Sequence, residues 1–323
     1  MQTWEMVTAV GSMQKSPMRL LCLTDVQTQA ERAEWLTAEF RLEPGISEII
    51  DIAGASTDTS EKELMHLRDV QVVQAADVII PVSLRRGGAM MKLVEQARDD
   101  GKEIVDDFMC EYTDRSASLA YTVSPDDINP DLSKVAGHYL FHWTRANNSA
   151  WPGERLLDFY RAVIESERYP RTAFDTLNNI IGSRKLIASS RHMPERIPTV
   201  SFTALAPEEA APLMRWRARF SQMSFEPYGI GIATEACVGL GISPVRYYDR
   251  STSVSRNADD SWLSQSIGTV TDWRQEKEYR HRGDLLLSDL PTEQMIVVCC
   301  THEEAREVEA RYRVVRAIAF CRG

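Results

Sequence analysis

Two glutamates, Glu276 and Glu278, stand two residues apart beside Trp273 and Arg280, just ahead of the apolar run 285–287. In an extended segment both carboxylates point to the same face, because side chains alternate along a strand. A carboxylate on an inward face must be paired or take part in chemistry, since burying an unpaired charge is costly. The alternative is a solvated, charged turn, which is the commoner environment of a run of charges.

Further polar side chains stand on a segment with a strand pattern, residues 139–145. Alternation puts His142 and Thr144 on one face of this segment and Phe141 and Trp143 on the other. The histidine is a candidate binding residue. The alternative is a packed, hydrogen-bonded histidine, which is the more common role of a single histidine on a strand.

Two more strand segments carry candidate residues. Ser201 shares one face of segment 198–203 with Thr203. Tyr228 opens segment 228–233, whose glycines allow another backbone to approach closely. A strand hydroxyl and a core aromatic ring are the structural alternatives for Ser201 and Tyr228.

A loop in the first half has the composition of a phosphate site. Arg85, Arg86, Gly87 and Gly88 directly precede a predicted helix at 90–99. Free backbone N–H groups at a helix start, the helix dipole and two guanidiniums could together hold a phosphate. The alternative is a turn with two surface arginines.

Short apolar strands alternate with amphipathic helices before residue 111. This alternation predicts a parallel sheet covered by helices, which is the α/β class. The predicted strands are 19–25, 47–52, 77–82 and 103–106, and the predicted helices are 27–40, a helix through Val73 capped by Thr59 or Ser60, and 90–99.

The second half has many short strands, with helices concentrated in its first part. This order predicts an α+β domain and not a second parallel sheet. The predicted strands are 139–145, 198–203, 228–233, 244–248 and 294–300, and the predicted helices are 153–170, 174–181 and one around 212–223 that carries Arg215, Arg217 and Arg219.

The length and composition indicate a globular protein of two domains. The chain has 323 residues, and single cores rarely exceed ~250–300 residues. With 43% hydrophobic residues, it is not of the disordered class. Its apolar runs stay below the ~18 residues of a membrane-spanning helix, so no membrane partner is expected. Six cysteines without a C-x-x-C pair predict buried reduced thiols in a cytoplasmic protein and no metal site.

The net charge of −10 is unevenly distributed. The first 136 residues hold 13 Lys and Arg against 24 Asp and Glu, and the rest hold 24 against 23. Of the later 24 basic residues 22 are Arg, which suits bidentate contacts to phosphate or carboxylate. Pairing of these arginines with local glutamates is the equal alternative.

The charge shift coincides with a run rich in Pro, Asp and Asn near residue 125. We therefore expect a linker at 125–136, between a domain at 18–124 and a second domain at 137–323. Residues 1–17 lack the features of a signal peptide and are expected to form a ragged terminus.

An ordered set of motifs in the second half resembles the ADP-ribosyltransferase fold. The motifs are His-x-Thr at 142–144, Ile-Ala-Ser at 187–189, Val-Ser-Phe-Thr at 200–203, Tyr-Gly-Ile at 228–230 and Glu-x-Glu-Tyr-Arg at 276–280. The similarity covers about residues 137–300 and is nearest to bacterial DarT-like and phage-defence or abortive-infection groups. An insertion at 146–172 departs from the compact pattern. The resemblance implies that NAD⁺ is cut at the nicotinamide–ribose bond and that ADP-ribose passes to an acceptor.

The resemblance also implies residue roles. Glu278 matches the catalytic glutamate, whose carboxylate stabilises an oxocarbenium-like ribose. Glu276 matches the first carboxylate of the pair, which activates the acceptor in protein-modifying members. His142, supported by Thr144, matches the residue that hydrogen-bonds the adenosine-side ribose.

Three further positions receive roles in the same way. Ser201 matches the motif that shapes the nicotinamide pocket. Tyr228 is the candidate for stacking on nicotinamide, with Tyr247 and Tyr248 as competitors. Arg280 is expected to hold a phosphate or to pin the catalytic glutamate.

The first half resembles the SLOG superfamily, a Rossmann-like group that includes DprA and LOG-type proteins. The matching residues are Val78 to Ala89, then Leu93, Ala97, Gly101, Lys102 and Val105, within a span of about 18–110. This implies a domain that binds a nucleotide-derived ligand or nucleic acid for sensing, at Arg85, Arg86, Gly87 and Gly88. LOG-type enzymes carry Pro-Gly-Gly-x-Gly-Thr-x-x-Glu, which this chain lacks, so glycosidic cleavage by this half is not expected.

Together the two resemblances imply a toxin-like ADP-ribosyltransferase of phage defence. Its substrate would be NAD, its acceptor a nucleic acid or a protein, and its N-terminal domain a nucleotide sensor. An antitoxin or a second copy of the chain is an expected partner. The alternatives are a non-catalytic antitoxin-like or NAD-binding module of an abortive-infection system and an NAD hydrolase, in which water is the acceptor.

Overall fold

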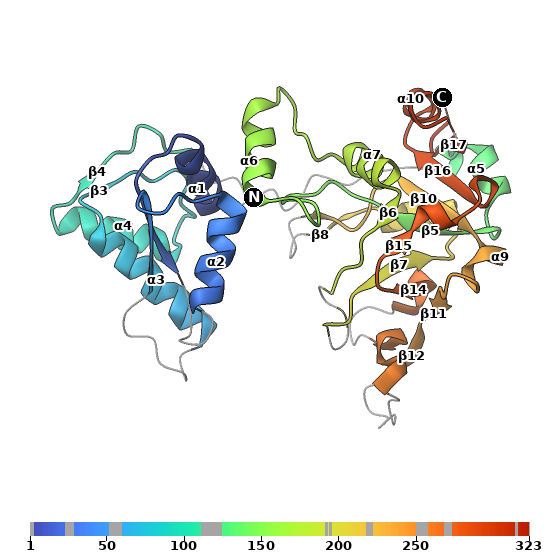
Figure 1. The fold of residues 1–323 in the computed structure, drawn as a ribbon, viewed down its shortest axis with the longest axis horizontal. Coiled ribbons are helices and arrows are strands. Elements are labelled where there is room, and N and C mark those ends of the chain that lie inside the picture. The colour runs from blue at the N-terminus through green and yellow to red at the C-terminus, as the bar shows by residue number, and fades with distance from the viewer. Residues whose placement is uncertain are drawn as a thin grey trace. The chain divides into compact units, whose positions relative to one another are not determined.

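The computed structural model describes residues 3–22, 29–51, 60–110, 125–190, 193, 196–217, 222–249, 258–267, 273–313 and 316–322. Contacts divide the chain into two compact units (Figure 1). The N-terminal unit contains Met1–Arg115 and Ser149–Arg168, and the C-terminal unit contains Ser116–Asn148 and Tyr169–Gly323. The chain therefore passes between the units three times.

Parallel strand pairs form the sheet structure of the N-terminal unit. Strand β1 (Met18–Cys22) pairs with β2 (Ser47–Asp51), and β3 (Val78–Ile79) pairs with β4 (Glu103–Ile104). The predicted parallel pairing is confirmed for these strands. They form two separate ladders of two strands, however, and β3 and β4 are shorter than the predicted segments 77–82 and 103–106.

Helices connect the strands as the alternation predicts. They are α2 (Gln29–Phe40), α3 (Glu61–Ala75) and α4 (Ala89–Asp99). Ser60 caps α3, because its hydroxyl accepts from the Glu63 N–H while the Glu63 carboxylate accepts from the Ser60 N–H. This settles the predicted choice between Thr59 and Ser60 at the start of the helix.

The N-terminal residues expected to be a ragged terminus include helix α1 (Thr3–Met13). It packs with α2 against α6 (Leu156–Glu165), which lies beside them in Figure 1. The Tyr160 hydroxyl donates to Glu5 Oε2 over 2.5 Å, and the Leu156 N–H donates to Glu39 Oε2 over 2.8 Å. The insertion expected in the second domain therefore completes the core of the N-terminal unit.

Within the described residues, seven strands form one mixed sheet in the C-terminal unit, in the order β11-β14-β7-β5-β10-β16-β17. All neighbours are antiparallel except β16 and β17. Their bounds are β5 (Tyr139–Trp143), β7 (Thr199–Thr203), β10 (Gly229–Ala233), β11 (Ser243–Pro244), β14 (Glu278–Arg282), β16 (Met295–Cys299) and β17 (Arg316–Ala319). The predicted mixture of strands and helices is confirmed here.

Each face of this sheet has its own core, because side chains alternate along the strands. On one face, helices α7 (Ala173–Ser183) and α10 (His302–Arg311) pack over residues such as Ile230 and Val297. On the other face, α5 (Pro130–Lys134) packs over residues such as Phe141. We call these the α7/α10 face and the α5 face.

Short elements complete the C-terminal unit. They are η1 (Pro125–Asp127), β6 (Lys185–Leu186), α8 (Pro207–Ala210), η3 (Ala211–Leu213), β8 (Trp216–Arg217), β9 (Gln222–Met223), α9 (Thr234–Cys237), β12 (Arg246–Tyr248), η5 (Ala258–Leu263), β13 (Ser264–Ser266), η6 (Trp273–Glu276), β15 (Leu285–Leu286), η7 (Leu287–Asp289) and η8 (Thr292–Gln294).

Two expectations for this unit differ from the structure. The expected linker 125–136 contains η1 and α5, and Ile128 and Leu132 are buried in the core of the α5 face. The helix expected around 212–223 is replaced by η3 and by the hairpin strands β8 and β9. Ser224 holds this hairpin, because its N–H donates to the Arg215 carbonyl over 2.9 Å. Arg219 lies outside the described residues.

No helix in the described part of the chain is long and apolar enough to span a bilayer. The same residues contain no group of three or more His, Cys, Asp or Glu side chains placed to hold a metal ion.

Candidate active site

Glu278, Ser201 and Arg280 form one hydrogen-bonded cluster. Strands β14 and β7 are antiparallel, with Glu278 opposite Thr203 and Arg280 opposite Ser201, so these side chains share a face. The Ser201 hydroxyl donates to Glu278 Oε1 over 2.8 Å. Arg280 donates through Nε to Oε1 over 2.8 Å and through Nη2 to Oε2 over 3.0 Å. The carboxylate therefore has a fixed position and orientation.

Arg280 is itself immobilised by a second set of contacts. Its side chain is 3% exposed, and it donates to the Trp262 carbonyl over 2.8 Å and to Gln265 Oε1 over 2.9 Å. Most of its N–H groups are thus occupied inside the protein. Of the two roles expected for Arg280, pinning the Glu278 carboxylate fits this geometry better than holding a phosphate.

Glu276 does not continue the strand. It ends η6, and Lys277, with a φ of 44°, turns the chain into β14. The predicted extended conformation is therefore wrong at this position. The Thr203 hydroxyl donates to the Glu276 carbonyl over 2.6 Å and fixes the turn.

The Glu276 carboxylate nevertheless lies in the electrostatic field of the cluster. Burial raises its pKa above the ordinary value, and the negative charge of Glu278 adds to the effect, while Arg217, Arg215 and Arg280 oppose it. The carboxylate makes no hydrogen bond within the described part of the chain. It is therefore available for a ligand in a way that the Glu278 carboxylate is not.

His142 joins the cluster through the backbone. Strands β5 and β7 pair only at Phe141 and Thr203, and beyond this pair the His142 Nδ1 lies 2.8 Å from the Ser201 carbonyl oxygen. A carbonyl can only accept, so Nδ1 carries the proton and Nε2 is the other ring position. Burial lowers the pKa of His142, which favours a neutral ring with Nε2 as an acceptor.

The His142 ring and the Ser201 hydroxyl extend from opposite faces of the sheet. His142 contacts the Phe202 ring edge-on at 5.8 Å between centroids, and Phe202 belongs to the core of the α7/α10 face. Ser201 is the next residue along β7, so its side chain points to the other face. The predicted faces of these strands are confirmed, but His142 and Glu278 do not share one.

Thr144 and Tyr228 occupy structural positions away from Glu278. The buried Thr144 hydroxyl donates to the Tyr228 carbonyl over 3.2 Å, and the Tyr228 hydroxyl donates to Glu304 Oε1 over 2.8 Å. Tyr228 precedes β10, which lies three strands from β14 in the sheet order. Among the predicted site residues, these two are not brought together with Glu278.

Tyr247 is closer to the cluster than the sequence indicated. Burial raises its pKa to about 12, and the Glu278 charge contributes to this shift. The Val245 N–H donates to the Glu278 carbonyl over 2.9 Å, which brings β12 alongside the start of β14. Tyr247 was a competitor of Tyr228 for the aromatic position, and its place beside Glu278 now makes it the stronger candidate.

Two supporting residues have no motif in the sequence. The Trp262 carbonyl and the Gln265 side chain bind Arg280 from η5 and β13. Their segment follows residues 250–257, which lie outside the described part of the chain. The pairing of β13 with β12 brings this segment back to the cluster, and no sequence pattern indicates that pairing.

The Arg85–Gly88 loop is a tight turn ahead of α4. The Gly88 N–H donates to the Arg85 carbonyl over 2.9 Å, and Gly87 has a φ of 70°. A Cβ at Gly88 would lie 2.9 Å from the Arg85 carbonyl oxygen, so both glycines are required by the turn itself. Gly88 caps α4 without a side chain, and Arg85 and Arg86 are exposed. The helix start remains available to an anion.

Comparison with known proteins gives no further assignment. No family model matches the chain, and no curated protein and no solved structure is significantly similar to it.

Proposed function

We propose that the C-terminal unit is an ADP-ribosyltransferase that uses NAD and acts as a toxin-like effector in phage defence. The observation that carries the proposal is the Glu278 carboxylate of β14, held by Arg280 and by Ser201 of the neighbouring strand β7. Three of the motifs in the ordered set are thus on adjacent strands of one sheet, although they are separated by more than 50 residues in sequence.

The proposed role of Glu278 is electrostatic stabilisation of the reacting ribose. As the bond between nicotinamide N1 and ribose C1′ breaks, its electron pair leaves with nicotinamide and positive charge develops on the ribose. A preorganised carboxylate stabilises such a centre because it needs no reorganisation when the charge appears. Ser201 and Arg280 supply the preorganisation.

Glu276 is assigned to the acceptor. The acceptor group forms a bond to C1′ and loses a proton, and a nearby carboxylate with a raised pKa is a suitable base for that proton. Its carboxylate makes no hydrogen bond within the described residues, which agrees with this role. His142 extends from the opposite face of the sheet, so it is not assigned a contact with the NAD molecule that Glu278 would bind.

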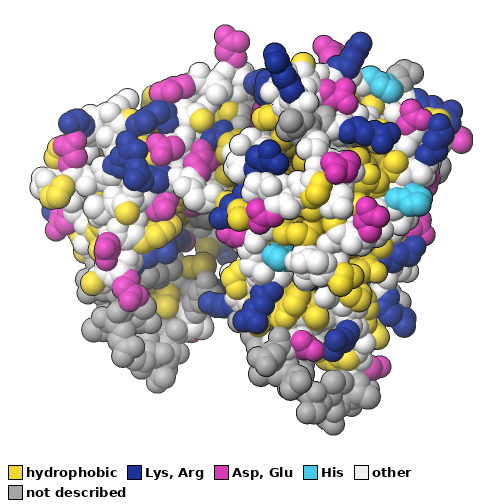
Figure 2. Space-filling view, turned by 45° about the vertical axis from the view of Figure 1, so that its right-hand side comes forward, with side chains coloured by type: hydrophobic (Ala, Val, Ile, Leu, Met, Phe, Trp, Pro, Cys, Tyr) yellow, Lys and Arg dark blue, Asp and Glu magenta, His cyan; other side chains and the backbone are white. Residues whose placement is uncertain are grey.

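The acceptor of ADP-ribose is either a nucleic acid or a protein. On the face of the C-terminal unit in Figure 2, basic side chains (dark blue) and acidic side chains (magenta) are interspersed over the described surface. Binding along a phosphate backbone requires clustered basic charge. This face therefore supports local contacts to an acceptor, such as those of Arg215 and Arg217 near Glu276, more than an extended nucleic-acid track.

The second candidate is a non-catalytic module. The observation that favours it is the engagement of Glu278, which already accepts three hydrogen bonds and is 15% exposed. An ion pair of this kind can serve as a structural tie between strands. An NAD hydrolase, with water as the acceptor, would use the same catalytic residues.

The test incubates the protein with NAD labelled in its adenylate part and with separate pools of DNA, RNA and cell protein. Label on one pool supports transfer, and free ADP-ribose supports hydrolysis. Glu278→Gln is expected to lower turnover about 10²–10³-fold, as for loss of one preorganised electrostatic contact. Glu293→Gln, an exposed glutamate in η8, is the matched control. Equal turnover in Glu278→Gln and the wild-type protein would contradict both enzymatic functions.

For the N-terminal unit we propose a nucleotide-sensing role centred on Arg85 and Arg86 at the start of α4. Free backbone N–H groups and two exposed guanidiniums support an anionic ligand there. A library of cyclic and linear nucleotides should contain a compound that raises the melting temperature of the wild-type protein. The double variant Arg85→Ala, Arg86→Ala should lose that shift, and an unchanged shift would count against this site.

A further inference from the structure

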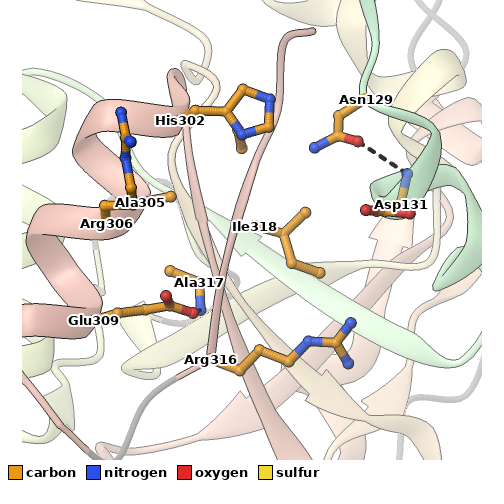
Figure 3. A pocket seen from close by; sticks show the side chains of 10 residues that line it. Asn129, Asp131, His302, Ala305, Arg306, Glu309, Arg316, Ala317 and Ile318 are labelled. Atoms are coloured by element: carbon orange, nitrogen blue, oxygen red, sulfur yellow. Dashed lines mark hydrogen bonds between the residues drawn. The ribbon is translucent and has the colours of Figure 1, made fainter. Parts of the chain in front are cut away.

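A groove lies at the edge of the C-terminal sheet opposite β14 and β11. It is bordered by α5, α10 and the edge strand β17, and has a volume of about 460 Å³ (Figure 3). Ile318 lies at its centre, and Asn129, His302 and Arg316 stand around it. These residues belong to neither of the two proposed sites.

The orientation of the Asn129 amide is fixed by its role as a helix cap. Its Oδ1 accepts from the Asp131 N–H over 3.0 Å, and only the oxygen end of the amide can accept that hydrogen bond. The Asn129 backbone N–H is bound to the Phe320 carbonyl over 2.8 Å, which anchors the residue to the sheet edge. The amide nitrogen must therefore point away from α5.

In Figure 3 the Asn129 nitrogen points into the groove, toward the side where His302 lies. The residue is 7% exposed, and its Nδ2 has no hydrogen-bond partner among the residues the structure describes. The Asn129 nitrogen is accessible from the groove, so its two N–H groups are free to donate to an acceptor of a ligand there.

The other side chains that line the groove also offer unused hydrogen-bond donors. The Asp131 carboxylate is paired with Lys134 over 2.8 Å, and Glu309 Oε1 accepts from the Ala317 N–H over 3.0 Å. His302, Arg306 and Arg316 make no hydrogen bond or ion pair within the described ranges. Both acidic side chains keep their negative charge, and Arg316 and His302 attract that of Asp131, but the N–H groups of the cationic and amide side chains have no hydrogen-bond partner within the described ranges.

The Glu309 contact also excludes one class of partner. Strand β17 is the last strand of the sheet, so its outer backbone groups are where an extended peptide would add. Glu309 already occupies the outward N–H of Ala317. This contact blocks one backbone position of the edge strand, so side-chain donors are the better-placed groups for a ligand of this groove.

We propose that this groove binds the oxyanion group, carboxylate or phosphate, of a small molecule. Asn129 Nδ2 supplies an oriented donor, and His302 and Arg316 supply charge-assisted contacts from the rim. The apolar surface of Ile318 and Ala305 accommodates the less polar part of the ligand. The site is independent of NAD chemistry, because it lies at the other edge of the sheet.

Asn129→Asp isolates the proposed donor. Aspartate caps a helix as well as asparagine does, so the Asp131 N–H keeps its acceptor and the fold should be retained. The substitution replaces the amide nitrogen with a second carboxylate oxygen, which repels an oxyanion. Arg316→Gln removes a rim charge without touching the cap, and Arg313→Gln removes an exposed arginine just beyond α10 as the matched control.

The experiment is calorimetric titration of the full-length protein with inorganic phosphate and, separately, with succinate, at constant ionic strength. We expect saturable binding of at least one probe, weakened about tenfold or more in Asn129→Asp and in Arg316→Gln and unchanged in Arg313→Gln. Binding of phosphate alone identifies a phosphorylated ligand, and binding of succinate alone identifies a carboxylate. No saturable binding of either probe, or equal binding by Asn129→Asp and wild-type protein, would overturn the proposal. Oxyanion binding should persist in Glu278→Gln.

Discussion

At the scale of single residues, the strongest constraint is the buried ion pair between Arg280 and Glu278. Arg280→Met should lower the free energy of unfolding by about 3 kcal/mol, because it leaves the Glu278 carboxylate with one donor in a position 15% exposed. Urea denaturation measures this difference. The control is Arg282→Met, at an exposed arginine of the same strand, which should change stability by less than about 0.5 kcal/mol. Similar losses in both variants would show that the pair is not the stabilising feature.

The raised pKa of Glu276 predicts how stability depends on pH. The contribution of Glu276 to the free energy of unfolding should change with pH in the direction opposite to that of a typical carboxylate. Its pKa in the folded protein is raised above the ordinary value of 4.5, chiefly by burial. Its contribution to stability is therefore present below pH 4.5 and is lost as the pH rises through the raised pKa. Glu276→Gln does not titrate, so its stability relative to the wild-type protein should increase between pH 4 and pH 7.

Urea denaturation of both proteins at several pH values tests the Glu276 prediction. Gln275→Ala, at the exposed neighbouring residue, gives the background for a substitution in the same helical turn. Its stability difference from the wild-type protein should not vary with pH. A Glu276→Gln difference that is constant or decreases with rising pH would contradict the proposed burial of this carboxylate.

At the scale of elements, the glycines of β10 set the spacing of the central strands. A Cβ at Gly229 would lie 2.6 Å from the His142 carbonyl oxygen and 2.9 Å from Trp143 Cε3. Gly229→Ala must therefore displace β5 from β10 and move His142, at a cost of about 1–3 kcal/mol. Gly239→Ala is the matched control, because its nearest atom would be 3.6 Å away. Thermal unfolding should separate the two variants, and equal melting temperatures would show that the strands adjust freely.

Sequence patterns predict helices and strands well where interactions between residues close in sequence determine them. The segment 139–145 became β5 with Phe141 and His142 on the predicted faces, because alternation is a property of the strand itself. The expected helix at 212–223 failed because the contacts of Ser224 with Arg215 fold this segment into a hairpin. The turn at Lys277 was missed for a similar reason, since it depends on the Thr203 hydroxyl from another strand.

The candidate site was predictable only in part. The motifs predict Glu278, Ser201 and Arg280 as site residues, and the strand register brings them together. The order of the motifs predicts that Tyr228 stacks on nicotinamide, whereas the structure shows its hydroxyl donating to Glu304. Trp262 could not be found from the sequence, because it contributes a backbone carbonyl, which every residue type possesses.

At the scale of the whole molecule, the N-terminal unit is discontinuous in sequence. Helix α6 lies more than 100 residues after α2, and no local signal connects the two. Its Leu156, Leu157, Phe159 and Tyr160 are buried with Leu36 and Phe40 in one core. None of the three passages of the chain between the units falls at the expected boundary 125–136, which lies inside the C-terminal unit.

This topology predicts the outcome of truncation. A chain that starts at residue 125 keeps α6 but lacks α1 and α2, so the apolar side chains of Leu157 and Phe159 lose the surfaces that bury them. Such a patch promotes association. The truncated chain should elute from size-exclusion chromatography as aggregates, whereas the same chain with 149–168 replaced by a Gly/Ser linker should elute as a discrete species. Equal behaviour of the two chains would mean that α6 does not depend on the N-terminal unit for its burial.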